Sequence, residues 1–252
     1  MRIHSLQWII LCSLLVACKS QQSWHLAEIN PDTYRFDRYV GVDDDAAINA
    51  LIAPYKAELD QEMNKVVAVL DHELTKQRPE STLGNFLADI MQIQAEKYTN
   101  RRVDFAVQNY GGIRVPSVAP GNITKGTVFE IMPFDNSLLV LESTGDIVQK
   151  LCNKIASSGG WPSSEGLRFV IDGDKATNIS ITGEALDPNK SYTYALPDYI
   201  ANGGDGSDFL MTEKRIDTEK LIREVMIDYL MELTASGETI HQEITGRITY
   251  KD

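Results

Sequence analysis

The chain has 252 residues, of which 43% are hydrophobic and 24% are charged, a balance typical of a globular protein with a sizeable core. Its length favours one domain, or one domain with a tail. The formal net charge of -12 argues against binding to a nucleic acid polymer, because an acidic surface repels a phosphate backbone. A phosphate-bearing ligand must therefore be small and must meet a local positive site.

The N-terminus predicts a targeting segment over residues 1–17. Arg2 is followed by an apolar run, 8–17, which is too short to span a bilayer as a mature helix and is better explained by removal after export. The run ends in Leu-Val-Ala-Cys, which resembles the lipobox of bacterial lipoproteins and implies that Cys18 becomes the lipid-bearing first residue. The alternative is an ordinary secretory signal with an incidental cysteine.

This resemblance implies a lipid-anchored protein of the bacterial cell envelope. Lys19, directly after the lipid-bearing cysteine, favours the outer membrane, facing the periplasm. The polar stretch that follows suits a tether over 18–41, which needs no structure of its own, and the folded domain is expected over 42–252. After processing only Cys18 and Cys152 remain, so no disulfide framework forms, and Cys152 is expected to be a buried, inert thiol.

Helices and strands alternate along the rest of the chain. Three aspartates, 43–45, precede an apolar segment and favour a helix start there. A second helix is expected from Ser81 or Thr82 through Ile93, because its apolar residues recur at helical spacing. The further expected elements are strands at 103–108 and 137–141, a helix from Gly145 to about 157, strands at 167–171, 176–182 and 192–196, and a last helix marked by Thr218 and apolar residues from Leu221 to Leu233.

These elements predict an α+β fold of mixed layers, in which several helices cover a mixed β-sheet. No sequence period suggests repeats. Four segments stand out against this background, each with residue types suited to ligand contact. They are 80–85 (ESTLGN), 109–114 (NYGGIR), 132–136 (MPFDN) and 199–206 (YIANGGDG).

The set of four segments, in this order, resembles the C-terminal domain of 5'-nucleotidases and of related cyclic-phosphodiesterase and sugar-nucleotide hydrolases. The resemblance spans roughly residues 42–250. No single segment is decisive, but the ordered set is highly specific. It implies a domain that recognises a nucleoside or nucleotide.

Asn109 and Arg114 flank a double glycine after a predicted strand. The glycines let the backbone approach a ligand closely, an amide can pair with a base edge, and a guanidinium offers fixed donors to a phosphate or hydroxyl. A tight turn with a solvated arginine is the simpler interpretation of this motif alone. The family pattern reverses that preference.

Phe134 and Tyr199 are the candidate base-stacking residues, since the resemblance implies that a base lies between the aromatic rings at these positions. Packing of Phe134 in the core is the alternative, and it is the commoner fate of a lone aromatic residue. Asp205 lies among glycines, and its carboxylate suits a ribose diol, as the resemblance implies; stabilisation of the turn is its alternative role. Thr82 occupies a position where many family members carry a basic residue, which puts phosphate affinity in doubt.

Residues for catalysis are missing from this sequence. Relatives hydrolyse phosphate esters with two metal ions in a separate N-terminal domain, and the histidines here, His4, His25, His72 and His241, have no neighbouring ligands for such a site. The stretch 71–73 (Asp-His-Glu) is interpreted as a solvated polar segment between two helices. No nucleophile elbow or phosphate-binding Walker loop is present. We therefore assign no catalytic residue, metal ligand or cofactor to this chain.

The leading hypothesis is the nucleoside-binding half of a 5'-nucleotidase, active only with a separately encoded metallophosphoesterase domain that carries the divalent metal pair. A second hypothesis is a non-catalytic lipoprotein of the envelope that captures or senses a nucleoside or nucleotide. A third is a degenerate domain kept for envelope interactions. A phosphoesterase partner would favour the first, and base binding by Phe134 and Tyr199 would argue against the third.

Overall fold

The computed structural model describes residues 45–251. The predicted signal segment, Cys18 and the tether therefore lie outside the described residues. Over 45–251, no helix is both long enough and apolar enough to cross a membrane.

The first described helix, α2 (Ala46–Met63), begins where the aspartates predict a helix start. The Asp45 carboxylate accepts the backbone N–H groups of Ala47 at 2.8 Å and Ile48 at 3.2 Å. It thereby satisfies donors that have no partner within the first turn. No residue of α2 is buried.

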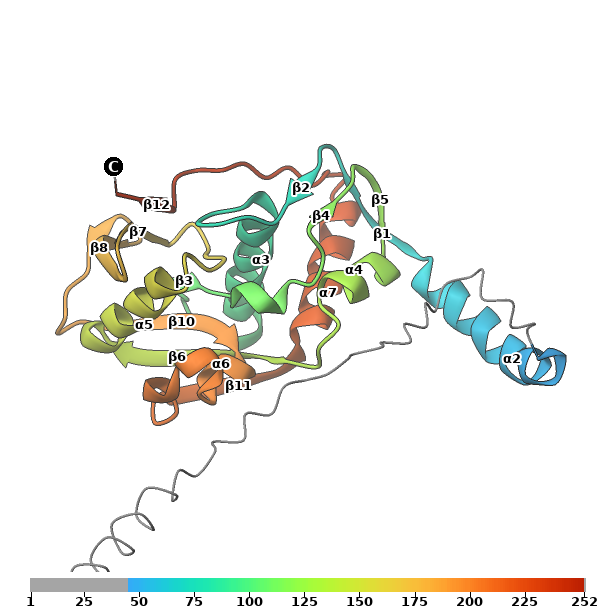
Figure 1. The fold of residues 1–252 in the computed structure, drawn as a ribbon, viewed down its shortest axis with the longest axis horizontal. Helices are drawn as coiled ribbons and strands as arrows, with labels where there is room; N and C mark the ends of the chain where they lie inside the picture. Colours follow the sequence, from blue (N-terminus) through green and yellow to red (C-terminus); the bar gives the residue numbers. More distant parts are fainter. Residues whose placement is uncertain (1–44, 252) are drawn as a thin grey trace, which may run out of the picture. The chain divides into compact units, whose positions relative to one another are not determined.

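A mixed four-stranded sheet, the central sheet, has the strand order β11-β6-β10-β3 (Figure 1). β10 runs parallel to β3 and antiparallel to β6, and β11 runs antiparallel to β6. The strands are β3 (Phe105–Ala106), β6 (Ser137–Thr144), β10 (Ser191–Pro197) and β11 (Lys214–Leu221). This arrangement confirms the predicted mixed sheet.

Neighbouring residues of β6 enter two different cores. Leu138 and Val140 pack with residues of α3 (Thr82–Thr99) and α7 (Ile222–Ala235), whereas Leu139 and Leu141 pack with residues of α5 (Gly145–Ser157). Side chains alternate between the faces of a strand. At β6 the central sheet is therefore buried on both faces, with α3 and α7 on one and α5 on the other.

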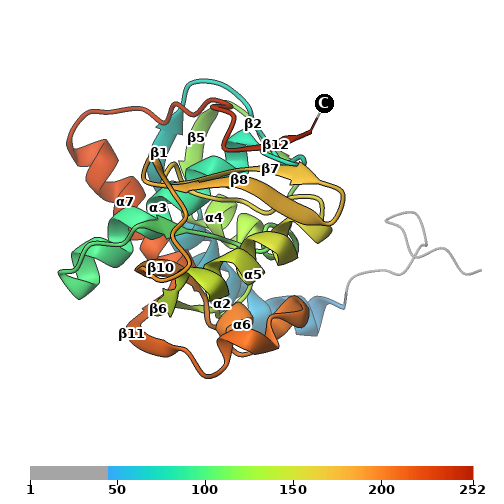
Figure 2. The same ribbon diagram turned by 90° about the vertical axis from the view of Figure 1, so that its left-hand side faces the viewer.

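A second four-stranded sheet, in the order β12-β7-β8-β9, covers the other side of α5 (Figure 2). Its strands are β7 (Leu167–Asp172), β8 (Lys175–Ile181), β9 (Glu184–Ala185) and β12 (Ile248–Tyr250). The smaller described elements are two strand pairs, β1 (Val66–Leu70) with β5 (Gly121–Thr124) and β2 (Leu74–Thr75) with β4 (Ser117–Val118), and two short helices, α4 (Lys125–Ile131) and α6 (Asp198–Ala201).

Three local predictions are wrong. The strand expected at 103–108 is reduced to β3, because Phe105 and Ala106 are the residues of this segment that pair with β10. The Gln108 N–H turns to the Pro162 carbonyl at 3.0 Å. The last helix begins at Ile222, not at Thr218. The stretch 71–73 joins strands β1 and β2, not two helices.

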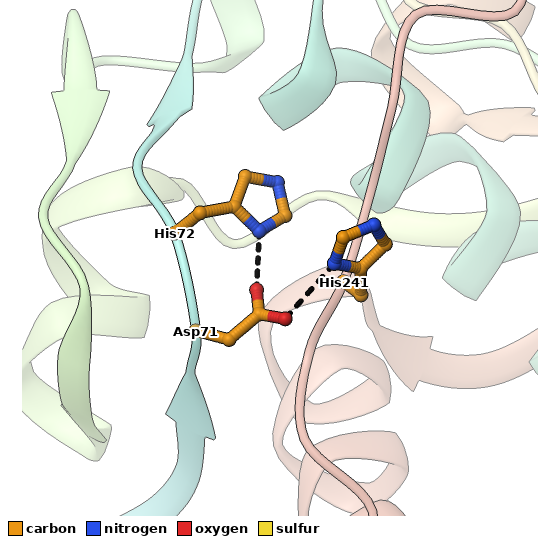
Figure 3. A group of neighbouring side chains, drawn as sticks. All are labelled: Asp71, His72 and His241. Atoms are coloured by element: carbon orange, nitrogen blue, oxygen red, sulfur yellow. Dashed lines mark hydrogen bonds and ion pairs between the residues drawn. The ribbon is translucent and has the colours of Figure 1, made fainter.

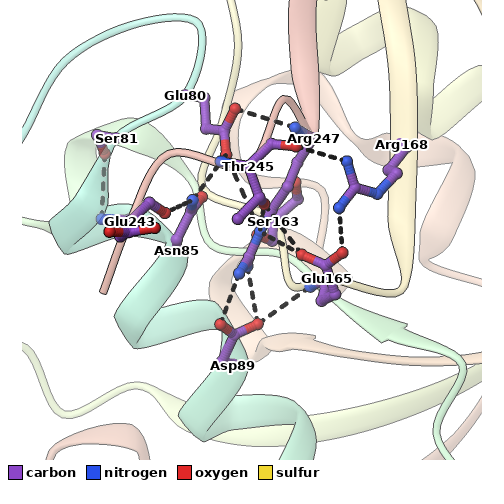
Figure 4. Close-up of polar contacts among 11 residues, drawn as sticks. Glu80, Ser81, Asn85, Asp89, Ser163, Glu165, Arg168, Glu243, Thr245 and Arg247 are labelled. Atoms are coloured by element: carbon purple, nitrogen blue, oxygen red, sulfur yellow. Dashed lines mark hydrogen bonds and ion pairs between the residues drawn. The ribbon is translucent and has the colours of Figure 1, made fainter. Parts of the chain in front are cut away.

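A buried arginine ties the C-terminal segment to the domain (Figure 4). The Arg247 side chain is 3% exposed, and its guanidinium donates to both carboxylate oxygens of Asp89 in α3, each at 2.8 Å, and to the Ser163 carbonyl at 2.9 Å. The Glu80 carboxylate accepts the backbone N–H of Thr245 at 3.0 Å and that of Arg247 at 2.9 Å. The segment leading into β12 is thus fixed by charge-assisted hydrogen bonds.

Cys152 is fully buried in α5, and this burial raises the pKa of its thiol. Since the thiolate is the reactive form, we expect iodoacetamide at mildly alkaline pH to leave Cys152 unmodified in the folded protein and to modify it completely in guanidinium. Mass spectrometry of the Cys152 peptide measures both. Equal modification in the two conditions would contradict the burial of this side chain.

Candidate functional site

A pocket of about 580 Å³ gathers all five predicted ligand-binding side chains. Its lining consists of Asn109, Gly111, Gly112, Arg114, Phe134, Asp135, Asn136, Tyr199 and Asp205. These residues come from three of the four segments singled out in the sequence. The fourth segment, 80–85, forms the start of α3 instead, where Ser81 accepts the Gly84 N–H at 3.1 Å as the helix cap.

The topology of the central sheet brings the pocket residues together. Asn109 follows β3 and Tyr199 follows β10, and these two strands are parallel, so their carboxyl ends lie at the same edge. Phe134 precedes β6, which is antiparallel to β10, so the start of β6 lies at that edge too. Loops at the carboxyl ends of parallel strands are a common place for ligand sites.

The two candidate stacking residues are exposed within this pocket. Phe134 is 41% exposed and Tyr199 is 45% exposed, so the alternative that Phe134 packs in the core is wrong. The Arg114 guanidinium carbon lies 5.5 Å from the centre of the Phe134 ring, within reach of a cation–π contact. Two aromatic faces and one cation therefore line the same opening.

A hydrogen-bonded triplet of Asn109, Tyr199 and Asp205 lines the same pocket. Asn109 Nδ2 donates to Asp205 Oδ2 at 2.8 Å, and the Tyr199 hydroxyl donates to Asp205 Oδ1 at 3.1 Å. Asp205 has a backbone φ of +53°, a left-handed conformation that aspartate tolerates better than most residues. Each carboxylate oxygen keeps capacity for a further donor, such as a hydroxyl.

Two basic residues that the sequence reasoning missed lie beside Arg114. Lys76 Nζ and the Arg78 guanidinium carbon are each 4.0 Å from the centre of the Tyr110 ring. Burial lowers the pKa of Lys76, and the charges of Arg114 and Arg78 add to this effect. A local cluster of three cations thus exists on an acidic protein. The sequence signal that could have revealed this cluster was the presence of two cations, Lys76 and Arg78, shortly before the helix-capping residue Ser81.

Thr82, a position at which the family resemblance implies a basic residue, links two elements. Its Oγ1 accepts the backbone N–H of Thr75 in β2 at 2.9 Å, so it joins the first turn of α3 to that strand. The basic side chains beside the pocket come instead from the loop between β2 and α3, through Lys76 and Arg78.

Comparisons with known proteins identify the family to which this chain is similar. The model of the family described as "5'-nucleotidase, C-terminal domain" matches residues 65–214. Protein UshA of Yersinia enterocolitica is 31% identical over 216 residues, which cover 82% of this chain and 38% of that protein. The 5'-nucleotidase of Vibrio parahaemolyticus is 28% identical over 216 residues, which cover 79% of this chain and 37% of that protein.

A solved structure is similar over the same part of the chain. The 5'-nucleotidase precursor from Thermus thermophilus superposes with a TM-score of 0.70 at 29% identity, covering 82% of this chain and 43% of that one. The chain therefore spans well under half the length of these relatives. With the family model matched over 150 residues, from 65 to 214, the chain belongs to the 5'-nucleotidase C-terminal domain family.

Proposed function

We propose that this chain is the nucleoside-recognising half of a 5'-nucleotidase-type phosphohydrolase and acts together with a separately encoded metallophosphoesterase domain. The observation that carries the proposal is the convergence of five side chains, from segments far apart in the sequence, around one pocket. The chain covers only part of each relative, for example 38% of Protein UshA of Yersinia enterocolitica. The part of the relatives that it does not cover leaves room for a domain that performs the hydrolysis.

Each pocket residue has a role in this proposal. Phe134 and Tyr199 hold the base between their rings, and Asn109 meets its edge. Asp205 accepts the ribose hydroxyls, and Arg114 contacts the ribose or the phosphate. Lys76 and Arg78 add positive charge on the side of Arg114, where the phosphate of a nucleotide would be stabilised.

Hydrolysis in this proposal uses a water molecule activated by the divalent metal pair of the partner domain. The part of the pocket built by this chain holds the nucleoside in place, so that its phosphate meets that water. The lipid on Cys18 would keep the assembly at a membrane of the bacterial envelope, the outer membrane facing the periplasm. Nucleotide breakdown outside the cytoplasm is the process that such an assembly would serve.

A second candidate function is capture or sensing of a nucleoside without an enzymatic partner. It is favoured by one observation: the five proposed contacts all come from this chain, so binding itself requires no second protein. The two candidates differ only in what happens after binding.

The test is calorimetric titration of adenosine and AMP into the full chain in detergent, followed by addition of the lone metallophosphoesterase domain encoded nearest to its gene. We expect saturable binding of both ligands, and phosphate release from AMP only when the two proteins are combined. Binding without phosphate release by the combination would favour the capture function. No binding by either the chain or the combination would overturn both candidates.

The Tyr199 ring packs against Gly204, where there is no room for a side chain. A Cβ at position 204 would lie 2.6 Å from ring atoms of Tyr199 and 2.5 Å from its carbonyl oxygen, so Gly204→Ala must displace the ring. We expect adenosine affinity to fall by about fivefold or more, the loss of one stacking contact. In the control variant Gly126→Ala, made in α4 outside the pocket, the new Cβ meets nothing closer than 3.2 Å, and Tyr199 stays in place. Equal affinities of Gly204→Ala and the parent would show that this ring position is not needed.

A further inference from the structure

A cluster of one carboxylate and two imidazole side chains lies outside the ligand pocket. Asp71 and His72 are in the turn between β1 and β2, and His241 is in the segment after α7 (Figure 3). One ligand atom from each of these three residues lies within 4.8 Å of the others. The stretch 71–73 was interpreted from the sequence as a solvated polar segment, and the contribution of His241 could not be foreseen.

The backbone fixes these two segments side by side. Ile240 donates its N–H to the Val69 carbonyl at 2.9 Å, and Asp71 donates its N–H to the Ile240 carbonyl at 3.3 Å. Leu70 and Ile240 form a parallel β-bridge. The three side chains are therefore positioned by main-chain hydrogen bonds and do not depend on their own contacts to meet.

Each of the two rings has an acceptor at both nitrogens. His72 Nε2 lies 2.8 Å from the Gln242 carbonyl oxygen, and His241 Nε2 lies 3.5 Å from a carboxylate oxygen of Glu243. Both of these oxygens only accept hydrogen bonds, so they favour a proton on Nε2. In a neutral imidazole, Nδ1 then carries the lone pair.

Both Nδ1 atoms point at the same carboxylate. His241 Nδ1 is 2.9 Å from Asp71 Oδ2, and His72 Nδ1 is in direct contact with Asp71 Oδ1. The ring centres lie 4.6 Å apart. Two neutral rings with the proton on Nε2 would direct two lone pairs at an anion, an arrangement that is stabilised either by protons on the rings or by a metal cation among the three groups.

We propose that Asp71, His72 and His241 bind a divalent transition-metal ion of the Zn²⁺ class. A set of two imidazole nitrogens and one carboxylate favours binding of Zn²⁺ over Ca²⁺ or Mg²⁺. Water would fill the fourth coordination position at this exposed site. When a histidine binds a metal ion through Nδ1, its Nε2–H usually donates a hydrogen bond to a carbonyl or carboxylate oxygen. The ion would cross-link the β1–β2 turn to the segment after α7.

The test is titration of Zn²⁺ into the full chain in detergent, with Co²⁺ as a spectroscopic probe of coordination. We expect one equivalent of Zn²⁺ to bind, with an affinity at least about tenfold lower in His241→Ala and in Glu243→Ala. Since His241 is 59% exposed, its replacement is not expected to impair folding. Zn²⁺ should also raise the Tm of the parent and not that of His241→Ala.

The matched control is His25→Ala, which removes a histidine that lies outside the described residues and should leave Zn²⁺ affinity unchanged. Thiols of the full chain contribute equally to the parent and to every variant, so the difference between them isolates the histidine site. Zn²⁺ affinity unchanged in His241→Ala, or no Zn²⁺ binding by the parent, would overturn the proposal. The two rings would then be held by protons alone.

Discussion

Replacing Phe134 and Tyr199 together by alanine is expected to lower adenosine affinity by at least about thirtyfold. Each stacking contact between a base and an aromatic ring contributes roughly 1–3 kcal/mol, and a loss of about 2 kcal/mol already corresponds to about thirtyfold in the dissociation constant. Both rings are exposed in the pocket, so their removal takes away ligand contacts and leaves the core intact. Calorimetric titration of adenosine measures the change.

Two single variants separate stacking from other effects of the double replacement. Tyr199→Phe keeps the ring and removes only the hydroxyl that donates to Asp205, so its affinity should stay within about threefold of the parent. Tyr250→Ala removes an aromatic residue of β12 that is 54% exposed and lies outside the pocket, and it should have no effect on adenosine affinity. A double variant that binds as tightly as the parent would mean that the base lies elsewhere, and the roles proposed for the pocket would fail.

The pocket could be predicted because its residues lie in short motifs with local signals. Asn109 precedes a double glycine, Phe134 follows a proline, and Asp205 lies among glycines, so each segment by itself indicates a loop suited to ligand contact. The resemblance to a family then placed these loops at one site. Topology explains why they meet: parallel strands β3 and β10 end at the same edge of the sheet.

Contacts between distant segments could not be predicted in the same way. His241 meets Asp71 only because Ile240 pairs with Leu70 across 170 positions of sequence, and no local pattern encodes that pairing. Lys76 and Arg78 were not singled out in the sequence, because their approach to Tyr110 depends on the path of the loop between β2 and α3. The sequence shows the charge and type of each of these residues, but it does not show which residue each one contacts.

The error at the last helix has a different cause. Thr218 is a good helix-capping residue, and the apolar residues after it recur at helical spacing, which favoured a helix from that point. In the structure Thr218 belongs to β11, and its hydroxyl donates to the Leu138 carbonyl of β6 at 2.8 Å. The sheet edge offered by β6 outweighed the local preference, as tertiary context often does.

Arg247→Met is expected to destabilise the domain by about 3 kcal/mol and to lower its Tm by about 6–12 °C. The substitution keeps most of the side-chain volume and removes the charge. It leaves the Asp89 carboxylate, 24% exposed, without its bidentate partner, and Glu80, 5% exposed, without its nearby guanidinium. A carboxylate that is buried and has lost its cation costs far more than an exposed one. Thermal unfolding followed by circular dichroism measures the shift.

Arg102→Met provides the matched control, because it makes the same chemical change at an arginine outside this network, whose side chain is 72% exposed and pairs with Asp104. Water screens that pair, so its loss should cost at most about 1 kcal/mol. Equal shifts in the two variants would mean that the Arg247 network contributes no more than a surface ion pair. A large shift confined to Arg247→Met would identify this arginine as the residue that fixes the C-terminal segment, and with it strand β12, to α3.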